Sequence, residues 1–147
     1  MTIDPTNPIV QLCAEGMNLE GEGKRTEAAQ TFMRAWGMAT SHYEQFIAAH
    51  YVARHQPSVA AKLQWDLKAL DAAQKVGSDQ IAGAYPSLYL NIAKCYEDLG
   101  EYETARQNYQ AALSLTTSMS DDGYGKMIKS GILAGLARIA DEKKRQI

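Results

Sequence analysis

Runs of alternating Val, Ile and Thr, which are typical of β-strands, are nearly absent from this 147-residue sequence. Ala, Leu, Glu, Gln and Lys dominate instead, and apolar residues recur at spacings of three and four, which is the period of an α-helix. The sequence therefore predicts an all-α protein.

Long apolar runs and an excess of positive charge are also missing. No apolar stretch approaches the roughly 20 residues that span a bilayer, and the polar residues 1–8 hold no apolar signal core. The net charge is −2, so no overall positive field attracts nucleic acid or anionic lipid. We therefore expect a cytoplasmic protein that binds neither nucleic acid nor membrane.

Patterns that carry catalysis or bind metals are absent as well. Cys13 and Cys95 have no CxxC or His-rich neighbourhood, and His50 and His55 do not share a helix face, so no metal site is expected. There is no GxSxG, HExxH or P-loop, and Gly21-x-Gly23 joins two helices rather than a strand and a helix. An enzyme such as a methyltransferase is therefore disfavoured, and no cofactor is expected.

Helix signals predict about seven helices. Thr26, Ser41 and Ser58 can each cap a helix start, and Gly77 can end a helix. The expected ranges are about 8–20, 26–39, 41–54, 58–76, 79–99, 102–116 and 123–144. For residues 78–85 a loop remains possible, but we prefer an early start to the fifth helix, with a kink at Pro86.

Small residues recur at one spacing in three pairs of predicted helices. In each pair a small residue of the first helix precedes a small residue of the second by 12 positions: Gly16 and Ala28, Ala49 and Ala61, Ala93 and Ala105. Small residues allow helices to cross closely, so this regularity indicates repeated helical hairpins.

The fifth and sixth predicted helices contain Tyr89-x2-Ile92-Ala93-x2-Tyr96, then Gly100 and Tyr102, then Ala105-x3-Tyr109-x2-Ala112. This pattern resembles the tetratricopeptide repeat, and the two earlier hairpins match it less well. The resemblance implies a single domain over 1–147, in which antiparallel hairpins stack into a right-handed superhelix with a concave groove. The repeats would be 8–40, 41–77 and 79–117, followed by a capping helix over 121–144.

Some positions depart from the family pattern. Glu15, Gln45 and Lys68 stand where apolar or small residues are usual, and the second and third repeats are about ten residues further apart than in the family. The aromatic residues at packing positions are expected in the core: Phe32, Trp65, Tyr89, Tyr96 and Tyr109.

The resemblance also implies where a ligand would bind, because the first helix of each hairpin lines the groove in this family. Asn91 and Lys94 resemble an Asn and a Lys with which some members grip a terminal carboxylate. The other interpretation of this stripe, which stays open, is a solvated face of an otherwise packed helix. Tyr43 and Phe46 are expected to be open on this surface. The full set of candidate groove residues is Tyr43, Phe46, His50, Arg54, Ser87, Asn91, Lys94, Asp98, Lys126 and Lys129.

The function that the resemblance implies is a protein–protein interaction scaffold that binds a peptide or protein segment in the groove. Two alternatives remain open at this point: a homo-oligomeric structural protein, with a homodimer as its simplest form, and a regulator that senses a small ligand.

Overall fold

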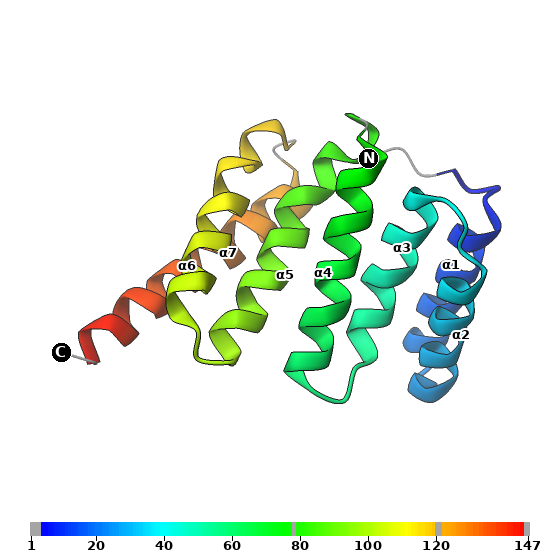
Figure 1. Cartoon of the computed structure of the whole chain (residues 1–147), viewed down its shortest axis with the longest axis horizontal. Coiled ribbons are helices and arrows are strands. Elements are labelled where there is room, and N and C mark those ends of the chain that lie inside the picture. Colours follow the sequence, from blue (N-terminus) through cyan, green and yellow to red (C-terminus); the bar gives the residue numbers. More distant parts are fainter. Residues whose placement is uncertain (1–3, 78, 120–121, 146–147) are drawn as a thin grey trace. The chain divides into compact units, whose positions relative to one another are not determined.

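The computed structural model describes residues 4–77, 79–119 and 122–145, and within these ranges it contains seven α-helices, three short 3-10 helices and no strand (Figure 1). The prediction of an all-α protein with about seven helices is confirmed. The helices are α1 (Pro8–Gly21), α2 (Arg25–Met38), α3 (His42–Val52), η1 (Ala53–His55), α4 (Val59–Val76), η2 (Asp79–Ala84), α5 (Tyr85–Asp98), α6 (Tyr102–Ser114), η3 (Thr116–Ser118) and α7 (Gly123–Arg145).

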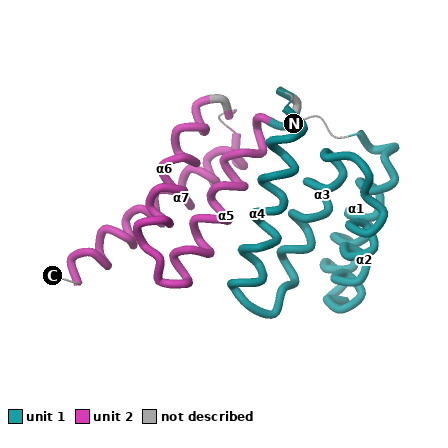
Figure 2. Tube along the Cα trace, viewed as in Figure 1, with its two compact units in different colours: residues 1–81 teal, residues 82–147 magenta. Residues whose placement is uncertain are grey.

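The chain divides into two compact units, residues 1–81 and 82–147 (Figure 2). In unit 1, α1 packs on α2, α3 packs on α4, and α3 also contacts α1 and α2. In unit 2, α5 packs on α6, and α7 lies against both. Neighbouring helices thus pack as two hairpins in unit 1 and as one hairpin covered by α7 in unit 2, while a single domain and a right-handed superhelix stay predictions.

Local capping explains several helix ends. The Ser41 hydroxyl accepts the Glu44 N–H at 3.1 Å, and the Glu44 carboxylate in turn accepts the Ser41 N–H, so both ends of a capping box are present. The Ser58 hydroxyl caps α4 in the same way, and Gly77 ends α4 with φ +60°, a left-handed conformation that favours glycine.

The start of α2 differs from the prediction. Arg25 is its first residue and Lys24 is the N-cap, so Thr26 lies inside the helix and caps nothing. The cause lies in the preceding turn, where Gly23 has φ +78° and the Lys24 N–H donates to the carbonyl of Leu19 at 2.9 Å. This Schellman turn closes α1 and turns the chain early enough for α2 to begin before Thr26.

The segment before α5 is neither a loop nor one long kinked α-helix. Residues Asp79–Ala84 form a 3-10 helix, and α5 begins at Tyr85 with Pro86 in its first turn. Proline fits there without a kink, because the first-turn N–H groups of a helix have no partner within the helix. Ser78 and the predicted boundary of the last helix at residue 121 lie outside the described residues.

Each unit has its own apolar core. Phe32 is fully buried in unit 1, and Tyr109 is fully buried in unit 2 beside Ile128, Ile132 and Ile139 of α7. The core prediction is thus confirmed for Phe32 and Tyr109. The remaining three aromatic residues of that prediction are only partly buried: Trp65, Tyr89 and Tyr96.

Candidate functional site

The candidate residues of unit 1 lie on α3 and on the short helix η1 that follows it. Tyr43 and His50 are half-buried, and Arg54 is exposed. Phe46 is only 3 % exposed, so its side chain belongs to the core and not to an open surface. The reason is that α3 contacts α1, α2 and α4, and its residues 46–49 are all buried.

His50 carries a polar atom without a partner in the described part of the chain. Its Nδ1 is buried and forms no hydrogen bond there, while its ring meets that of Tyr51 edge-on at 5.2 Å. Burial lowers the pKa of His50; the negative charge of Asp66 opposes this shift, and the positive charges of Arg54 and Lys62 add to it. The imidazole is therefore neutral at pH 7 and can donate or accept a hydrogen bond.

Tyr43 lies two turns before His50 on the same helix. Its hydroxyl is buried and makes no hydrogen bond of ordinary geometry within the described ranges. Burial raises the pKa of this phenol, and the nearby backbone of Asp4 partly opposes that rise. Tyr43 and His50 thus supply two polar groups on α3 that the fold itself does not use.

Arg54 is held by neighbouring side chains of unit 1. Its guanidinium lies 3.3 Å from the Glu20 carboxylate and 5.6 Å from the centre of the Tyr51 ring. The other oxygen of Glu20 contacts Nε2 of His55 at 2.7 Å. Arg54 is therefore part of a polar cluster that ties η1 to α1, and any ligand would compete with Glu20 for it.

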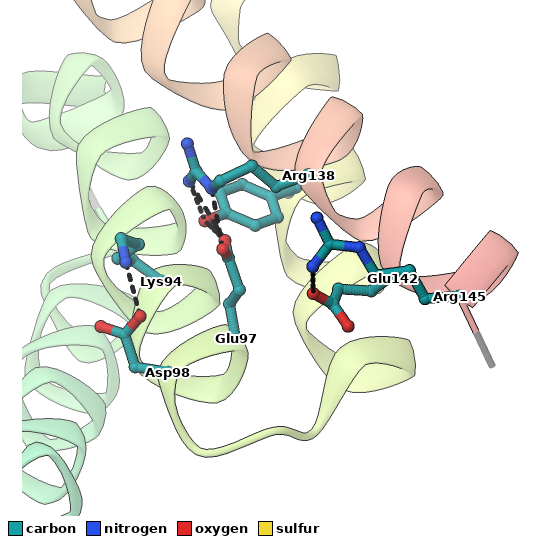
Figure 3. A network of polar contacts seen from close by, with 7 residues as sticks. Lys94, Glu97, Asp98, Arg138, Glu142 and Arg145 are labelled. Carbon is teal, nitrogen blue, oxygen red and sulfur yellow. Dashed lines mark hydrogen bonds and ion pairs between the residues drawn. The ribbon is translucent and has the colours of Figure 1, made fainter.

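The candidate residues of α5 differ in how strongly the fold engages them. The Ser87 hydroxyl donates to the Ala84 carbonyl at 3.0 Å, which is a local contact at the helix start. Lys94 pairs with Asp98 one turn later, and both side chains are largely exposed (Figure 3). Asn91, which lies between Ser87 and Lys94 in this stripe, is half-buried and has no side-chain hydrogen bond within the described ranges. Asn91 is thus the free polar group of this stripe.

Lys126 and Lys129 lie near the start of α7, on the helix that packs against α5 and α6. Lys126 is exposed and Lys129 is half-buried, and neither forms an ion pair with any residue that the structure describes. Both lysines therefore remain available to an anionic group.

A cluster that the sequence analysis missed joins all three helices of unit 2. Glu97 of α5 accepts hydrogen bonds from the Tyr109 hydroxyl of α6 at 2.7 Å and from Arg138 Nε of α7 at 2.8 Å. Figure 3 shows Glu97 and Arg138 pointing at one another across the two helices. Partial burial alone would raise the pKa of Glu97, but the hydrogen bonds from Arg138 and Tyr109 outweigh it and lower the pKa.

One signal in the sequence marks this cluster. Glu97 precedes the packing aromatic Tyr109 by 12 residues, and Glu20 precedes Phe32 by the same number. Both glutamates bind a cationic or ring nitrogen from the helical segment after the hairpin. The cluster fastens helices together, and its groups are already paired with one another.

The described residues hold few groups suited to catalysis or metal binding. Within them no three His, Cys, Asp or Glu side chains come together as metal ligands, and no helix is both long and apolar enough to cross a membrane. Cys13 and Cys95 are buried and form no disulfide, and burial raises the pKa of Cys13 to about 11. A thiol with that pKa is a poor nucleophile at neutral pH.

Comparison with known proteins gives one positive result, and it falls on α5 and α6. Residues 86–118 match the family model described as tetratricopeptide repeat. No curated protein and no solved structure matches the chain. The matched residues carry the hairpin in which Ala93 and Ala105 are fully buried and Tyr109 fills the space beside them. Residues 86–118 therefore form a tetratricopeptide repeat.

Proposed function

We propose that this chain is a protein-interaction scaffold that holds a peptide or protein segment against the first helices of its hairpins. Tetratricopeptide repeats generally mediate protein–protein interaction and seldom act as enzymes, and this supports a binding role without catalysis. The buried Cys13 and Cys95 form no disulfide, which suits a reducing compartment, so the proposal places the protein in the cytoplasm.

The observation that carries the proposal is the polar stripe on α5, within the matched repeat. Ser87, Asn91, Lys94 and Asp98 follow one another at spacings of four, three and four, so they share one side of the helix. The adjoining side of α5 is apolar and buried, with Leu88, Ile92 and Cys95. The stripe is thus a polar surface supported by a fixed core.

The groups of this stripe can exchange their present contacts for a ligand at small cost. The half-buried Asn91 amide has two donors and one acceptor without partners in the described residues. The exposed pair of Lys94 and Asp98 contributes only about 0.3–0.5 kcal/mol, so Lys94 can turn to a ligand carboxylate instead. An extended peptide offers matching groups, since its amides pair with Asn91 and its acidic side chains or terminus pair with Lys94.

Unit 1 offers a second contact region of the same kind. The buried Nδ1 of His50 and the hydroxyl of Tyr43 lie on the first helix of their hairpin and lack hydrogen bonds within the described residues. Leaving a buried polar group without a partner costs about 1–3 kcal/mol, so a ligand that reaches either atom gains from satisfying it. This second region would add a contact surface for a ligand on unit 1, and the proposed binding at α5 does not depend on it.

The test is affinity capture from lysate with the wild-type chain and the variant Asn91→Ala/Lys94→Ala. The matched control is Gln74→Ala/Lys75→Ala, because Lys75 also forms an exposed ion pair, with Asp71, one turn away on α4. We expect a partner that binds the wild type and the control but not the α5 variant. A partner retained by all three proteins would refute binding at the α5 stripe.

A further inference from the structure

One side of α7 remains uncovered. The helix packs against α5 and α6 through Ile128, Ile132, Gly135 and Ile139, which are all buried. Its opposite side, which we call the outer face of α7, is exposed and consists of Lys126, Met127, Ser130, Leu133, Ala134, Ala137, Ala140, Asp141 and Lys144.

The outer face of α7 is unusual for a solvent-exposed helix face. Met127 is 60 % exposed and Leu133 is 55 % exposed, and the positions between and beyond them are Ser or Ala. Charged residues occur only toward its two ends, with Lys126 at the start and Asp141 and Lys144 in the last turns. The residues follow the i, i+3, i+4 and i+7 spacing of a helix contact surface, so this face has the pattern of one that packs against another helix.

The face is complementary to itself when two copies run antiparallel. A two-fold axis between positions 133 and 134 places Leu133 opposite Ala134 of the second copy and Met127 opposite Ala140. Each large side chain thus meets a small one, which allows two helices to approach to about 8–10 Å. Ser130 then lies opposite Ala137.

The charges obey the same symmetry. The two-fold axis places Lys126 of one copy opposite Asp141 of the other, at both ends of the apolar strip. Neither side chain forms an ion pair within the described residues, so both are free to pair across the contact. Three other cations of the C-terminal half of α7 are already paired with acidic groups of the same unit: Arg138 with Glu97, Lys143 with Glu103 and Arg145 with Glu142.

We propose that two copies of this chain associate through the outer faces of α7, which form an antiparallel helix pair about a two-fold axis. Such an isologous contact uses one patch twice and closes on itself, so assembly stops at the dimer. One helix pair buries less area than the roughly 1,200 Å² of small stable interfaces, so we expect a weak dimer with a dissociation constant on the order of 10–100 µM. This inference concerns self-association and does not depend on the proposed peptide binding.

The first measurement is sedimentation velocity of the purified chain over protein concentrations from about 5 to about 500 µM, which bracket the expected dissociation constant. We expect the wild type to shift from monomer to dimer, and Leu133→Glu to remain monomeric across the range. The matched control is Met33→Glu, because Met33 is also a large apolar side chain, 45 % exposed, but lies on α2. The control should dimerise like the wild type. A wild type that stays monomeric, or a dimer that Leu133→Glu leaves intact, would overturn the proposal.

The antiparallel register has its own test. Lys126→Asp and Asp141→Lys each place like charges opposite one another at both ends of the contact, so each single variant should weaken the dimer by roughly two- to thirtyfold, as expected for loss of two exposed ion pairs. The double variant Lys126→Asp/Asp141→Lys restores opposite charges and should recover the wild-type dissociation constant. Circular dichroism of each variant checks that the helices are intact. If the double variant dimerises no better than the single ones, the register is refuted.

Discussion

Replacing Gly135 with alanine should destabilise the protein, whereas the same change at Gly131, one turn earlier on α7, should stabilise it. A β carbon at position 135 would lie 2.2 Å from Cζ of Tyr109 and 2.5 Å from Cε1 of the same ring. A β carbon at position 131 would lie 3.4 Å from the nearest atom, Cδ2 of Leu90, which is an ordinary contact. The two sites share a helix and differ in the space available.

The Tyr109 ring has little freedom to move away from a new methyl group. Its side chain is fully buried, and its hydroxyl is tied to the Glu97 carboxylate at 2.7 Å. A nitrogen of Arg138 lies 3.4 Å from the same hydroxyl. A shift of the ring would therefore stretch these contacts and disturb the packing of all three helices of unit 2.

The sizes of the energy terms predict opposite changes in the free energy of unfolding at the two sites. Alanine in a helix interior is about 1 kcal/mol more favourable than glycine, and this gain applies equally to Gly131 and Gly135. Forcing an extra carbon into a packed core costs about 1–3 kcal/mol, and loss of the hydrogen bond to Glu97 adds about 1.5–3 kcal/mol. We expect a net loss of about 1.5–5 kcal/mol for Gly135→Ala and a gain of about 0.5–1 kcal/mol for Gly131→Ala.

The assay is urea and thermal unfolding followed by circular dichroism, since 1 kcal/mol corresponds to a shift in Tm of about 2–4 °C for a chain of this size. In a Tyr109→Leu background the ring is gone, so Gly135→Ala should lose most of its cost, and the double-mutant cycle measures that coupling. An increase in Tm for Gly135→Ala in the wild-type background would refute the close approach of Gly135 and Tyr109.

Three further predictions concern single contacts. Ser41→Ala removes the cap of α3 and should lower the free energy of unfolding by about 1 kcal/mol, measured by urea unfolding with Ser114→Ala, an exposed serine of α6, as control. His50 has a lowered pKa in the folded state, so as the pH falls below about 6.5 the unfolded chain gains a proton that the folded chain does not, and stability drops. His50→Gln should remove this part of the pH dependence between pH 4.5 and 6.5, and unchanged curves would contradict it. Arg138→Met leaves Glu97 without its cation and should cost about 1 kcal/mol at pH 7; this difference should shrink in acid, where Glu97 is protonated, and an equal loss at pH 3 would contradict an ionic origin.

The helices were predictable from the sequence because their signals are local. Apolar spacing marks the buried side of each helix, and Ser41, Ser58 and Gly77 act within one turn of their own positions. Thr26 shows the limit of this reasoning. Its hydroxyl could accept a capping hydrogen bond at a helix start. The turn at Gly23, however, allows α2 to begin at Arg25, so Thr26 already lies inside the helix.

The candidate site was less predictable, because side-chain surroundings depend on contacts distant in sequence. Phe46 has the same apolar character in a groove or in a core, and only the packing of three helices around α3 places it in the core. The ion pair of Glu97 and Arg138 joins residues 41 positions apart, and no periodicity links them. Asn91 and His50 were found because the family resemblance supplies a helix face, and the structure shows that the fold leaves their polar atoms without partners in the described residues.

The two hairpins α1–α2 and α5–α6 repeat one another position by position, although the family model matches only the second. Gly23 and Gly100 are 77 residues apart, and both have positive φ, 78° and 80°, in turns with the same pair of backbone hydrogen bonds. The buried aromatics Phe32 and Tyr109 are separated by the same number of residues, as are Glu20 and Glu97.

This shared register includes the contacts that join each hairpin to the segment after it. Glu20 binds His55 of η1, and Glu97 binds Arg138 of α7. The two buried aromatic residues make different contacts. The Phe32 ring stacks on the His55 ring at 5.7 Å, whereas the Tyr109 hydroxyl donates a hydrogen bond to Glu97. The turn geometry, the buried aromatic ring and the glutamate contact are thus common to both hairpins, while the side chains around them differ. A single helical hairpin cannot bury its apolar face, so it needs a neighbouring segment to cover that face. A contact such as that of Glu20 with His55, or of Glu97 with Arg138, holds the covering segment in place.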